Sequence, residues 1–220
     1  MEHESRNIGA EYVAGIADAY MGATAEDVAN GRAWYPAAAR MARGIARRER
    51  VPMAAVAVAI AALSPRNPWR WNIADAAAMA RWHAQGRVYA RPTVTTFTSN
   101  ADRAADALEH GGRTWRSTAP KVRSFVANIL GDVDAVTVDV HATRAATFGE
   151  QDVPRTDREY QAIAAAYRTV AELVGETPRD LQAIVWLVAI RKYGRVPRQH
   201  ACKRGTFDYV RQYFGEAVAA

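Results

Sequence analysis

Apolar residues recur at intervals of three and four along most of the chain, and runs of strict alternation are short. This spacing is typical of helices that bury one face, so the pattern predicts an all-α protein. Prolines mark several breaks between helices, because the residue before a proline avoids helical backbone angles. The expected helices span residues 9–22, 35–50, 52–63, 71–85, 99–110, 120–130, 140–147, 157–175, 178–193 and 206–218.

Length and composition narrow the class of protein. The chain has 220 residues, of which 50% are hydrophobic, and this suits one compact domain or two small lobes. Cys202 is the only cysteine, which excludes an internal disulfide, and the first residues do not resemble a signal peptide. The longest apolar run, 51–63, is too short to cross a membrane. We expect a monomeric cytoplasmic protein without a membrane partner.

Positive charge exceeds negative charge and is unevenly distributed. The net charge is +6 and the pI is about 9.7, which favours a polyanionic partner. One basic cluster lies within a single expected helix, and it fits a phosphate contact and a solvated helix face equally well. A denser cluster near the C-terminus favours contact with nucleic acid. The first comprises Arg40, Arg43, Arg47, Arg48 and Arg50, and the second comprises Arg191, Lys192, Arg195, Arg198, Lys203, Arg204 and Arg211.

Two reactive residue types lie in one short segment. Lys121 follows Pro120 at the start of an expected helix, where the helix dipole disfavours a cation. Eighteen residues later comes Asp139, two positions before His141. Asp139 precedes an expected helix, so it also suits an N-cap, a role worth about 1 kcal/mol.

The segment from Lys121 to Arg144 resembles the catalytic segment of the helix-hairpin-helix (HhH-GPD) DNA glycosylases of the endonuclease III type. Members carry a lysine at the start of a helix, an Ala-Asn step within it, and then Val-Asp-x-His with an arginine three residues further on. The lysine-to-aspartate spacing resembles that of the members with lyase activity. The corresponding residues are Lys121, Ala127, Asn128, Val138, Asp139, His141 and Arg144.

Weaker similarity extends over the middle two-thirds of the chain. The helix that ends at Leu63-Ser64-Pro65 is similar to the helix before the DNA-inserting loop of the family, and the helices near 100–108 and 181–188 also match. The resemblance implies a single two-lobed helical domain. One lobe would comprise about 52–135, and the other would comprise the N-terminal helices and about 136–220.

Two features depart from the family pattern. The hairpin of the family carries a Gly-x-Gly turn that grips a DNA phosphate, whereas Arg116, Ser117 and Thr118 stand here and offer side-chain donors instead. The single cysteine excludes the iron–sulfur cluster of some members. The histidines lack metal-ligand spacing, so we expect neither a cofactor nor a metal.

The resemblance implies a role for each site residue. Asp139 would stabilise positive charge on the deoxyribose as the base leaves, and Lys121 would attack C1′ to form a Schiff base. The implied partner is double-stranded DNA with one base flipped out of the stack. His141 and Asn128 would orient the pair, although structural roles also suit them, and Trp186 is expected in the core. DNA contacts are expected from Ser64, Arg66, Asn67, Trp69, Arg70, Arg116, Ser117, Thr118 and Arg144, and the tryptophans at 69 and 71 equally suit core positions.

Three functions remain open at this level. The main expectation is a bacterial or phage-encoded DNA N-glycosylase with AP-lyase activity, acting in base excision repair. A second is a phage enzyme that hypermodifies a thymine-derived base on the same fold, which the missing glycine hairpin leaves open. A third is a DNA-binding protein that kept the fold without the chemistry. Asp139→Asn separates the third from the other two, because both enzymatic hypotheses predict loss of function and the third predicts no effect.

Overall fold

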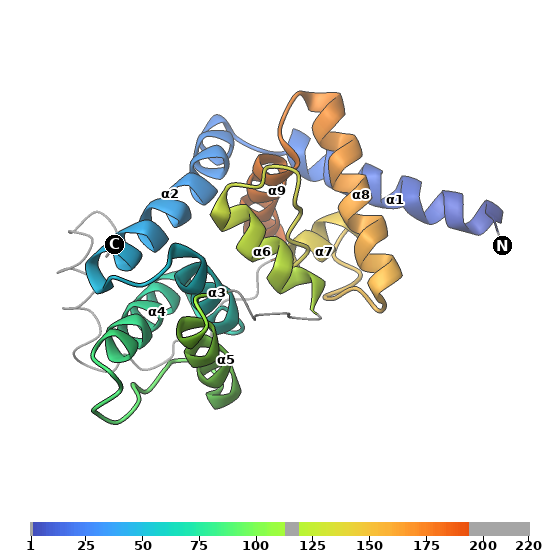
Figure 1. Ribbon diagram of the computed structural model, residues 1–220. Helices are drawn as coiled ribbons and strands as arrows, with labels where there is room; N and C mark the ends of the chain where they lie inside the picture. The colour runs from blue at the N-terminus through green and yellow to red at the C-terminus, as the bar shows by residue number, and fades with distance from the viewer. Residues whose placement is uncertain (1, 113–118, 194–220) are drawn as a thin grey trace. The chain divides into compact units, whose positions relative to one another are not determined.

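The computed structural model describes residues 2–112 and 119–193, with side chains from residue 9 onward. These residues form nine helices and no strand, which confirms the expected all-α class (Figure 1). The tenth expected helix, 206–218, lies outside the described residues. The helices are α1 (Glu2–Met21), α2 (Ala25–Glu49), α3 (Met53–Leu63), α4 (Trp69–Ala84), α5 (Thr98–Glu109), α6 (Pro120–Leu130), α7 (Val140–Ala146), α8 (Asp157–Val174) and α9 (Pro178–Tyr193).

Helix α2 begins ten residues earlier than the pattern predicts. The backbone N–H and the hydroxyl of Thr24 donate to Oδ2 of Asp27 at 2.8 and 2.9 Å, and the Asp27 N–H donates to Thr24 Oγ1 at 3.1 Å. This reciprocal cap satisfies amides that have no partner within the helix, and it starts α2 at Ala25. Pro36 lies inside the helix, so the prediction of a helix start near this proline was wrong.

The chain divides into two compact units. Among the described residues, unit 1 comprises 2–37 and 119–193, and unit 2 comprises 38–112. The division falls within α2, directly after Ala37. Lys121 and Asp139 both belong to unit 1. The lobe bounds near residues 52 and 135 that the resemblance implies stay a prediction.

Unit 1 is a helical bundle with a continuous apolar core. Helix α1 packs against α7, α8 and α9, and α9 also packs against α7 and α8. Two glycines allow close approach between helices. A Cβ at Gly15 would lie 2.5 Å from the carbonyl oxygen of Ala145, and a Cβ at Gly31 would lie 2.7 Å from Cα of Ile184. Larger residues at these two positions would push helices of unit 1 apart.

In unit 2, helix α3 is surrounded by its neighbours. Every residue from Ala55 to Leu63 is buried, and the helix packs against both α4 and α5. Gly112, which follows α5, adopts a positive φ of 76°, and a Cβ there would lie 2.9 Å from the backbone of Ala54. Helix α3 is the most apolar of the helices but has only 11 residues. None of the helices in the described part of the chain combines the length and apolarity needed to cross a membrane.

Candidate functional site

Asp139 is held by three N–H donors. It is the N-cap of α7, where Oδ1 accepts from the backbone amides of His141 at 3.0 Å and Ala142 at 2.9 Å. Oδ2 accepts from the indole Nε1 of Trp186 in α9 at 3.0 Å. The predicted N-cap role is confirmed. Trp186, which we predicted in the core, is partly rather than fully buried, and its indole N–H is a partner of the carboxylate.

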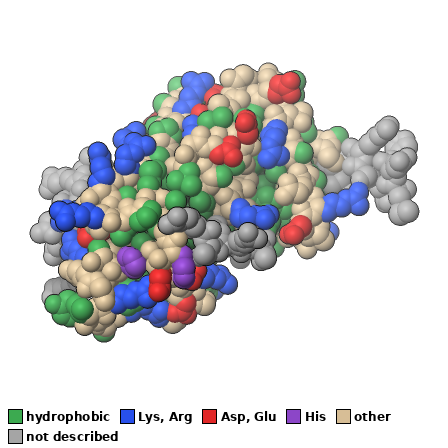
Figure 2. All heavy atoms as spheres, viewed as in Figure 1, with side chains coloured by type: hydrophobic (Ala, Val, Ile, Leu, Met, Phe, Trp, Pro, Cys, Tyr) green, Lys and Arg blue, Asp and Glu red, His purple; other side chains and the backbone are tan. Residues whose placement is uncertain are grey.

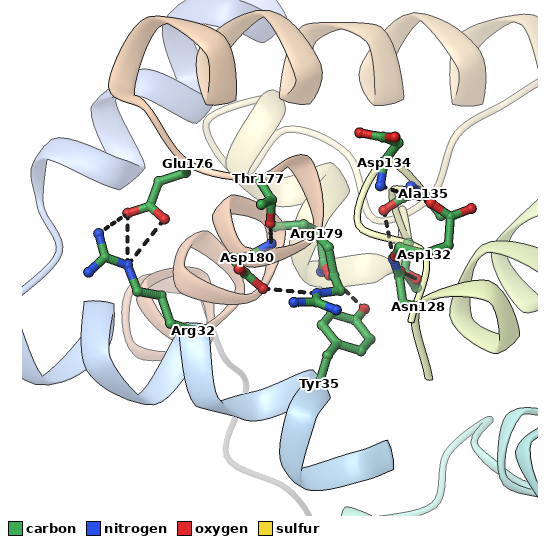
Figure 3. A network of polar contacts seen from close by, with 12 residues as sticks. Arg32, Tyr35, Asn128, Asp132, Asp134, Ala135, Glu176, Thr177, Arg179 and Asp180 are labelled. Atoms are coloured by element: carbon green, nitrogen blue, oxygen red, sulfur yellow. Dashed lines mark hydrogen bonds and ion pairs between the residues drawn. The ribbon is translucent and has the colours of Figure 1, made fainter. Parts of the chain in front are cut away.

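Asn128 shapes the loop that leads from α6 to Asp139. Its Nδ2 donates to the carbonyl oxygens of Asp132 at 2.9 Å and Ala135 at 2.8 Å, and its Oδ1 accepts from the hydroxyl of Thr137 at 2.8 Å. Oδ1 of Asp132 accepts two further backbone amides within the same loop (Figure 3). Asn128 is 1% exposed, and its hydrogen bonds hold the loop that precedes Asp139.

Two buried tyrosines of α8 hold the backbone on either side of Asp139. The hydroxyl oxygen of Tyr160 accepts from the Val138 amide at 3.1 Å and lies 3.0 Å from the carbonyl oxygen of Val136. The Tyr167 hydroxyl donates to the carbonyl oxygen of Ala142 at 3.2 Å. Burial raises the pKa of both phenols, and the Asp139 carboxylate also raises each pKa. Both therefore remain protonated hydrogen-bond donors at neutral pH.

The imidazole of His141 lies within the electrostatic range of both predicted catalytic residues. Burial lowers the pKa of His141, the Asp139 carboxylate raises it, and the cations of Arg144 and Lys121 lower it. Its buried Nδ1 has no hydrogen-bond partner among the described residues. Lys121 occupies the first turn of α6 and forms no hydrogen bond or ion pair with the part of the chain that the structure describes. The charges of Lys121 and Asp139 thus act in opposite directions on the pKa of His141.

Aromatic rings surround the Asp139–Trp186 hydrogen bond. The Trp34 ring centroid lies 5.9 Å from that of Trp186 and 6.0 Å from that of Phe125, and the His141 ring meets Trp186 edge-on at 5.9 Å. Tyr35 is fully buried, and its hydroxyl donates to Gln182 Oε1 at 2.8 Å. Trp34, Trp186 and His141 are partly buried, whereas Tyr35 is buried.

The comparisons with known proteins assign the chain to one family. The model of a family of unknown function (DUF7178) matches residues 1–193. The chain belongs to this family. The matched residues include Lys121, Asp139 and Trp186. No curated protein and no solved structure matches the chain. The description of the family names no activity.

The predicted DNA-inserting loop belongs to unit 2. Arg66 is exposed, adopts a positive φ of 55°, and places its guanidinium 5.7 Å from the Phe97 ring centroid. Arg70 is exposed as well, with its guanidinium 5.5 Å from the Trp71 ring centroid. Trp71 is 7% exposed, which confirms the core position considered for it. Trp69 is partly buried.

Ser64 and Asn67 of this loop form hydrogen bonds within unit 2. The hydroxyl of Ser64 donates to the Ala61 carbonyl oxygen at 3.0 Å. Nδ2 of Asn67 donates to the carbonyl oxygen of Leu63 and to Oδ2 of Asp75, which also accepts from a backbone amide at position 95. Burial raises the pKa of Asp75, and these donors lower it. The Asp75 carboxylate thus connects the loops that contain Asn67 and Thr95, and the groove contact expected of Asn67 stays a prediction.

Of the remaining expected DNA contacts, only Arg144 lies within the described residues. Arg144 is 8% exposed, and its guanidinium donates to Asp152 at 2.8 Å and to the Tyr193 carbonyl oxygen at 3.0 Å. This burial argues against the DNA contact expected of Arg144. Arg116, Ser117 and Thr118 lie outside the described residues, as does most of the C-terminal basic cluster. The described residues contain no group of histidine, cysteine and acidic side chains that could hold a metal ion.

Proposed function

We propose that the protein processes bases in double-stranded DNA, as a DNA N-glycosylase with associated lyase activity. The observation that carries the proposal is the carboxylate of Asp139, fixed by three donors beside an imidazole on which Lys121 also acts. The protein would act as a monomer in the cytoplasm of a bacterium or of a phage-infected cell. Its substrate would be a damaged or modified base.

A fixed carboxylate suits the departure of a base from deoxyribose. As the glycosidic bond breaks, positive charge develops on the sugar, and a negative charge already in place stabilises it without reorganisation. A carboxylate offers about four lone-pair directions. Three of them are used at Asp139, so its oxygens can still face the sugar or accept a proton from a nucleophile.

The side-chain amine of Lys121 is the kind of nucleophile that the lyase step requires. The chain contains 26 arginines and only three lysines, and a guanidinium stays protonated and cannot attack a sugar. Of the two lysines in the described residues, Lys192 pairs with Asp18 at 3.0 Å. The neutral amine of Lys121 would bond to C1′ while the base leaves with the bonding electrons and gains a proton. Ring opening then gives a Schiff base, which permits elimination at C3′.

The aromatic rings next to Asp139 suit a flipped base. A base that leaves the stack loses its neighbours, and enzymes replace them with aromatic side chains. Trp34 and Trp186 are partly buried residues, their ring centroids lie 5.9 Å apart, and the Trp186 indole donates to Asp139. We expect the flipped base to stack on one of these rings while its sugar lies beside the carboxylate.

Base release from a panel of duplexes tests the proposal. The panel holds uracil, thymine glycol, 8-oxoguanine, 5-hydroxymethyluracil or an abasic site, and released base and strand cleavage are measured separately. We expect release from at least one duplex, and a loss of about 100-fold or more in Asp139→Asn. Asparagine caps a helix as well as aspartate does, so the variant removes the charge and keeps the cap.

Two results would contradict the glycosylase proposal. A base altered in mass but still attached to its sugar would favour base hypermodification on the same site. Duplex binding without any chemical change, equal in the wild type and in Asp139→Asn, would favour a non-catalytic DNA-binding protein.

A further inference from the structure

The solvent-facing side of α2 within unit 2 carries a row of arginines. Arg40, Arg43 and Arg47 follow one another at helical spacings of three and four, and all three are exposed. Figure 2 shows Lys and Arg side chains over the surface where α2 lies. The opposite side of the helix is buried through Ala38, Ala42, Ile45 and Ala46.

Acidic side chains do not neutralise this row. From residue 38 to residue 74 the chain has seven arginines and one acidic residue, Glu49. The Glu49 side chain is 10% exposed and pairs with Arg81 at 3.5 Å. Arg40, Arg43 and Arg47 form no hydrogen bond or ion pair with the residues that the structure describes. The row therefore keeps its positive charge towards solvent.

Helix stability does not account for this arrangement. Like charges three or four residues apart destabilise a helix by about 0.2–0.5 kcal/mol per pair, and acidic residues between them would remove the cost. Helix α8 contains such acidic residues, because Asp157, Glu159 and Glu172 accompany Arg158 and Arg168. The uncompensated row on α2 thus fits a surface whose counter-charge comes from a partner.

We propose that Arg40, Arg43 and Arg47 form a docking surface for the phosphate backbone of nucleic acid. At a rise of about 1.5 Å per residue, Arg40 and Arg47 lie about 10.5 Å apart along the helix axis. Phosphates of one strand rise by about 3.4 Å per nucleotide along the duplex axis, so the row spans about three nucleotide steps when α2 lies parallel to that axis. Arginine is suited to this contact, because its planar guanidinium donates two parallel hydrogen bonds to one phosphate.

An anionic membrane fits this surface less well than nucleic acid does. A helix that lies on a membrane inserts its apolar face between the lipids. The apolar face of α2 is already buried in the core of unit 2, with Ala42 and Ile45 both 0% exposed. The docking surface also does not require the chemistry proposed at Asp139, which lies in unit 1, so failure of base release would leave this proposal standing.

Binding of a fluorescent, unmodified DNA duplex over a series of salt concentrations tests the surface. The full-length triple variant Arg40→Gln, Arg43→Gln, Arg47→Gln removes the row. Loss of three phosphate contacts lowers the slope of log K against log salt by about 2.7. The triple lysine variant keeps the charge, and it should retain most of this slope. A matched control, Arg155→Gln, Arg158→Gln and Arg168→Gln, makes the same change in net charge on and beside α8.

Three results would overturn the proposal. One is an unchanged slope in the glutamine variant, with its fold verified by circular dichroism. Another is an equal loss in the α8 control, which would show that net charge alone matters. The third is binding to phosphatidylglycerol vesicles but not to the duplex, which would identify a membrane as the partner. A reduced slope in the α2 glutamine variant alone supports the proposal.

Discussion

At Asp139 one carboxylate caps a helix and accepts an indole hydrogen bond. Capping accounts for Oδ1, which faces the first amides of α7, but capping does not require the bond from Trp186 to Oδ2. The indole N–H comes from a helix 47 residues further along the chain. This second bond restrains Oδ2, in addition to the two amides that hold Oδ1. We infer that the proposed reaction depends on the orientation of the Asp139 carboxylate as well as on its charge.

Trp186→Phe keeps an aromatic ring and removes the donor to Asp139. A hydrogen bond to a charged group contributes about 1.5–3 kcal/mol, and partial exposure places this one near the lower value. We expect the free energy of unfolding in urea to fall by about 1.5 kcal/mol. Trp82→Phe is the matched control, because it removes an exposed indole hydrogen bond to the carbonyl oxygen of Tyr89.

The double variant Trp186→Phe, Asp139→Asn isolates the pair. The loss caused by Trp186→Phe should shrink by about 1 kcal/mol when an asparagine amide replaces the carboxylate, because the two residues are in direct contact. Strictly additive losses would show that the indole stabilises unit 1 by packing alone.

His141 predicts how stability depends on pH. Burial and two nearby cations lower its pKa in spite of Asp139, so the folded protein binds this proton more weakly than the unfolded chain does. Between the lowered pKa and about pH 6.5, His141 binds more protons in the unfolded chain than in the folded protein. Its contribution to the free energy of unfolding is therefore fully present above about pH 6.5 and is lost as the pH falls through the lowered pKa. His141→Gln should flatten the fall in the free energy of unfolding between about pH 7 and pH 5.

His83 serves as the comparison for this measurement. Burial also lowers its pKa, so His83→Gln should flatten the pH dependence through unit 2, and the double variant should flatten it further. An unchanged pH dependence in His141→Gln would contradict the effect of its surroundings on this imidazole.

At the level of helices, local signals predicted most bounds. Pro120 begins α6, and Gly131 ends it with a positive φ of 111°, so the expected range of 120–130 matches the structure. The start of α2 was missed because a proline outweighed the Thr24 and Asp27 cap in the pattern, although the helix continues through Pro36. The bond between Trp186 and Asp139 could not be predicted from periodicity, since it depends on how α7 and α9 pack.

Two glycines of α2 provide a matched test of helix packing. A Cβ at Gly31 would lie 2.7 Å from the backbone of Ile184, whereas a Cβ at Gly44 has nothing within 4 Å. Gly31→Ala should therefore lower the free energy of unfolding by about 1–3 kcal/mol, as overpacking does. Gly44→Ala should raise it by up to about 1 kcal/mol, because alanine favours the helix. Urea-induced unfolding of both variants measures the difference, and a stabilising Gly31→Ala would contradict the close approach of α2 and α9.

For the whole molecule, the two proposed activities belong to different units. Lys121 and Asp139 lie in unit 1, and the arginine row lies in unit 2. Substitutions in the row should weaken binding to DNA of any sequence, whereas Asp139→Asn should remove chemistry and leave binding in place. The family resemblance proposed Lys121 and Asp139, and helical spacing proposed the arginine row, but their hydrogen bonds and exposure required the folded chain.

Borohydride trapping on a reactive duplex, followed by peptide mapping, tests the central claim most directly. We predict a covalent protein–DNA adduct on the peptide that contains Lys121. The adduct should disappear in Lys121→Arg, which keeps the charge but has no nucleophilic amine, and should persist in the matched Lys192→Arg. An adduct on another residue, or base release without any adduct, would contradict the role assigned to Lys121.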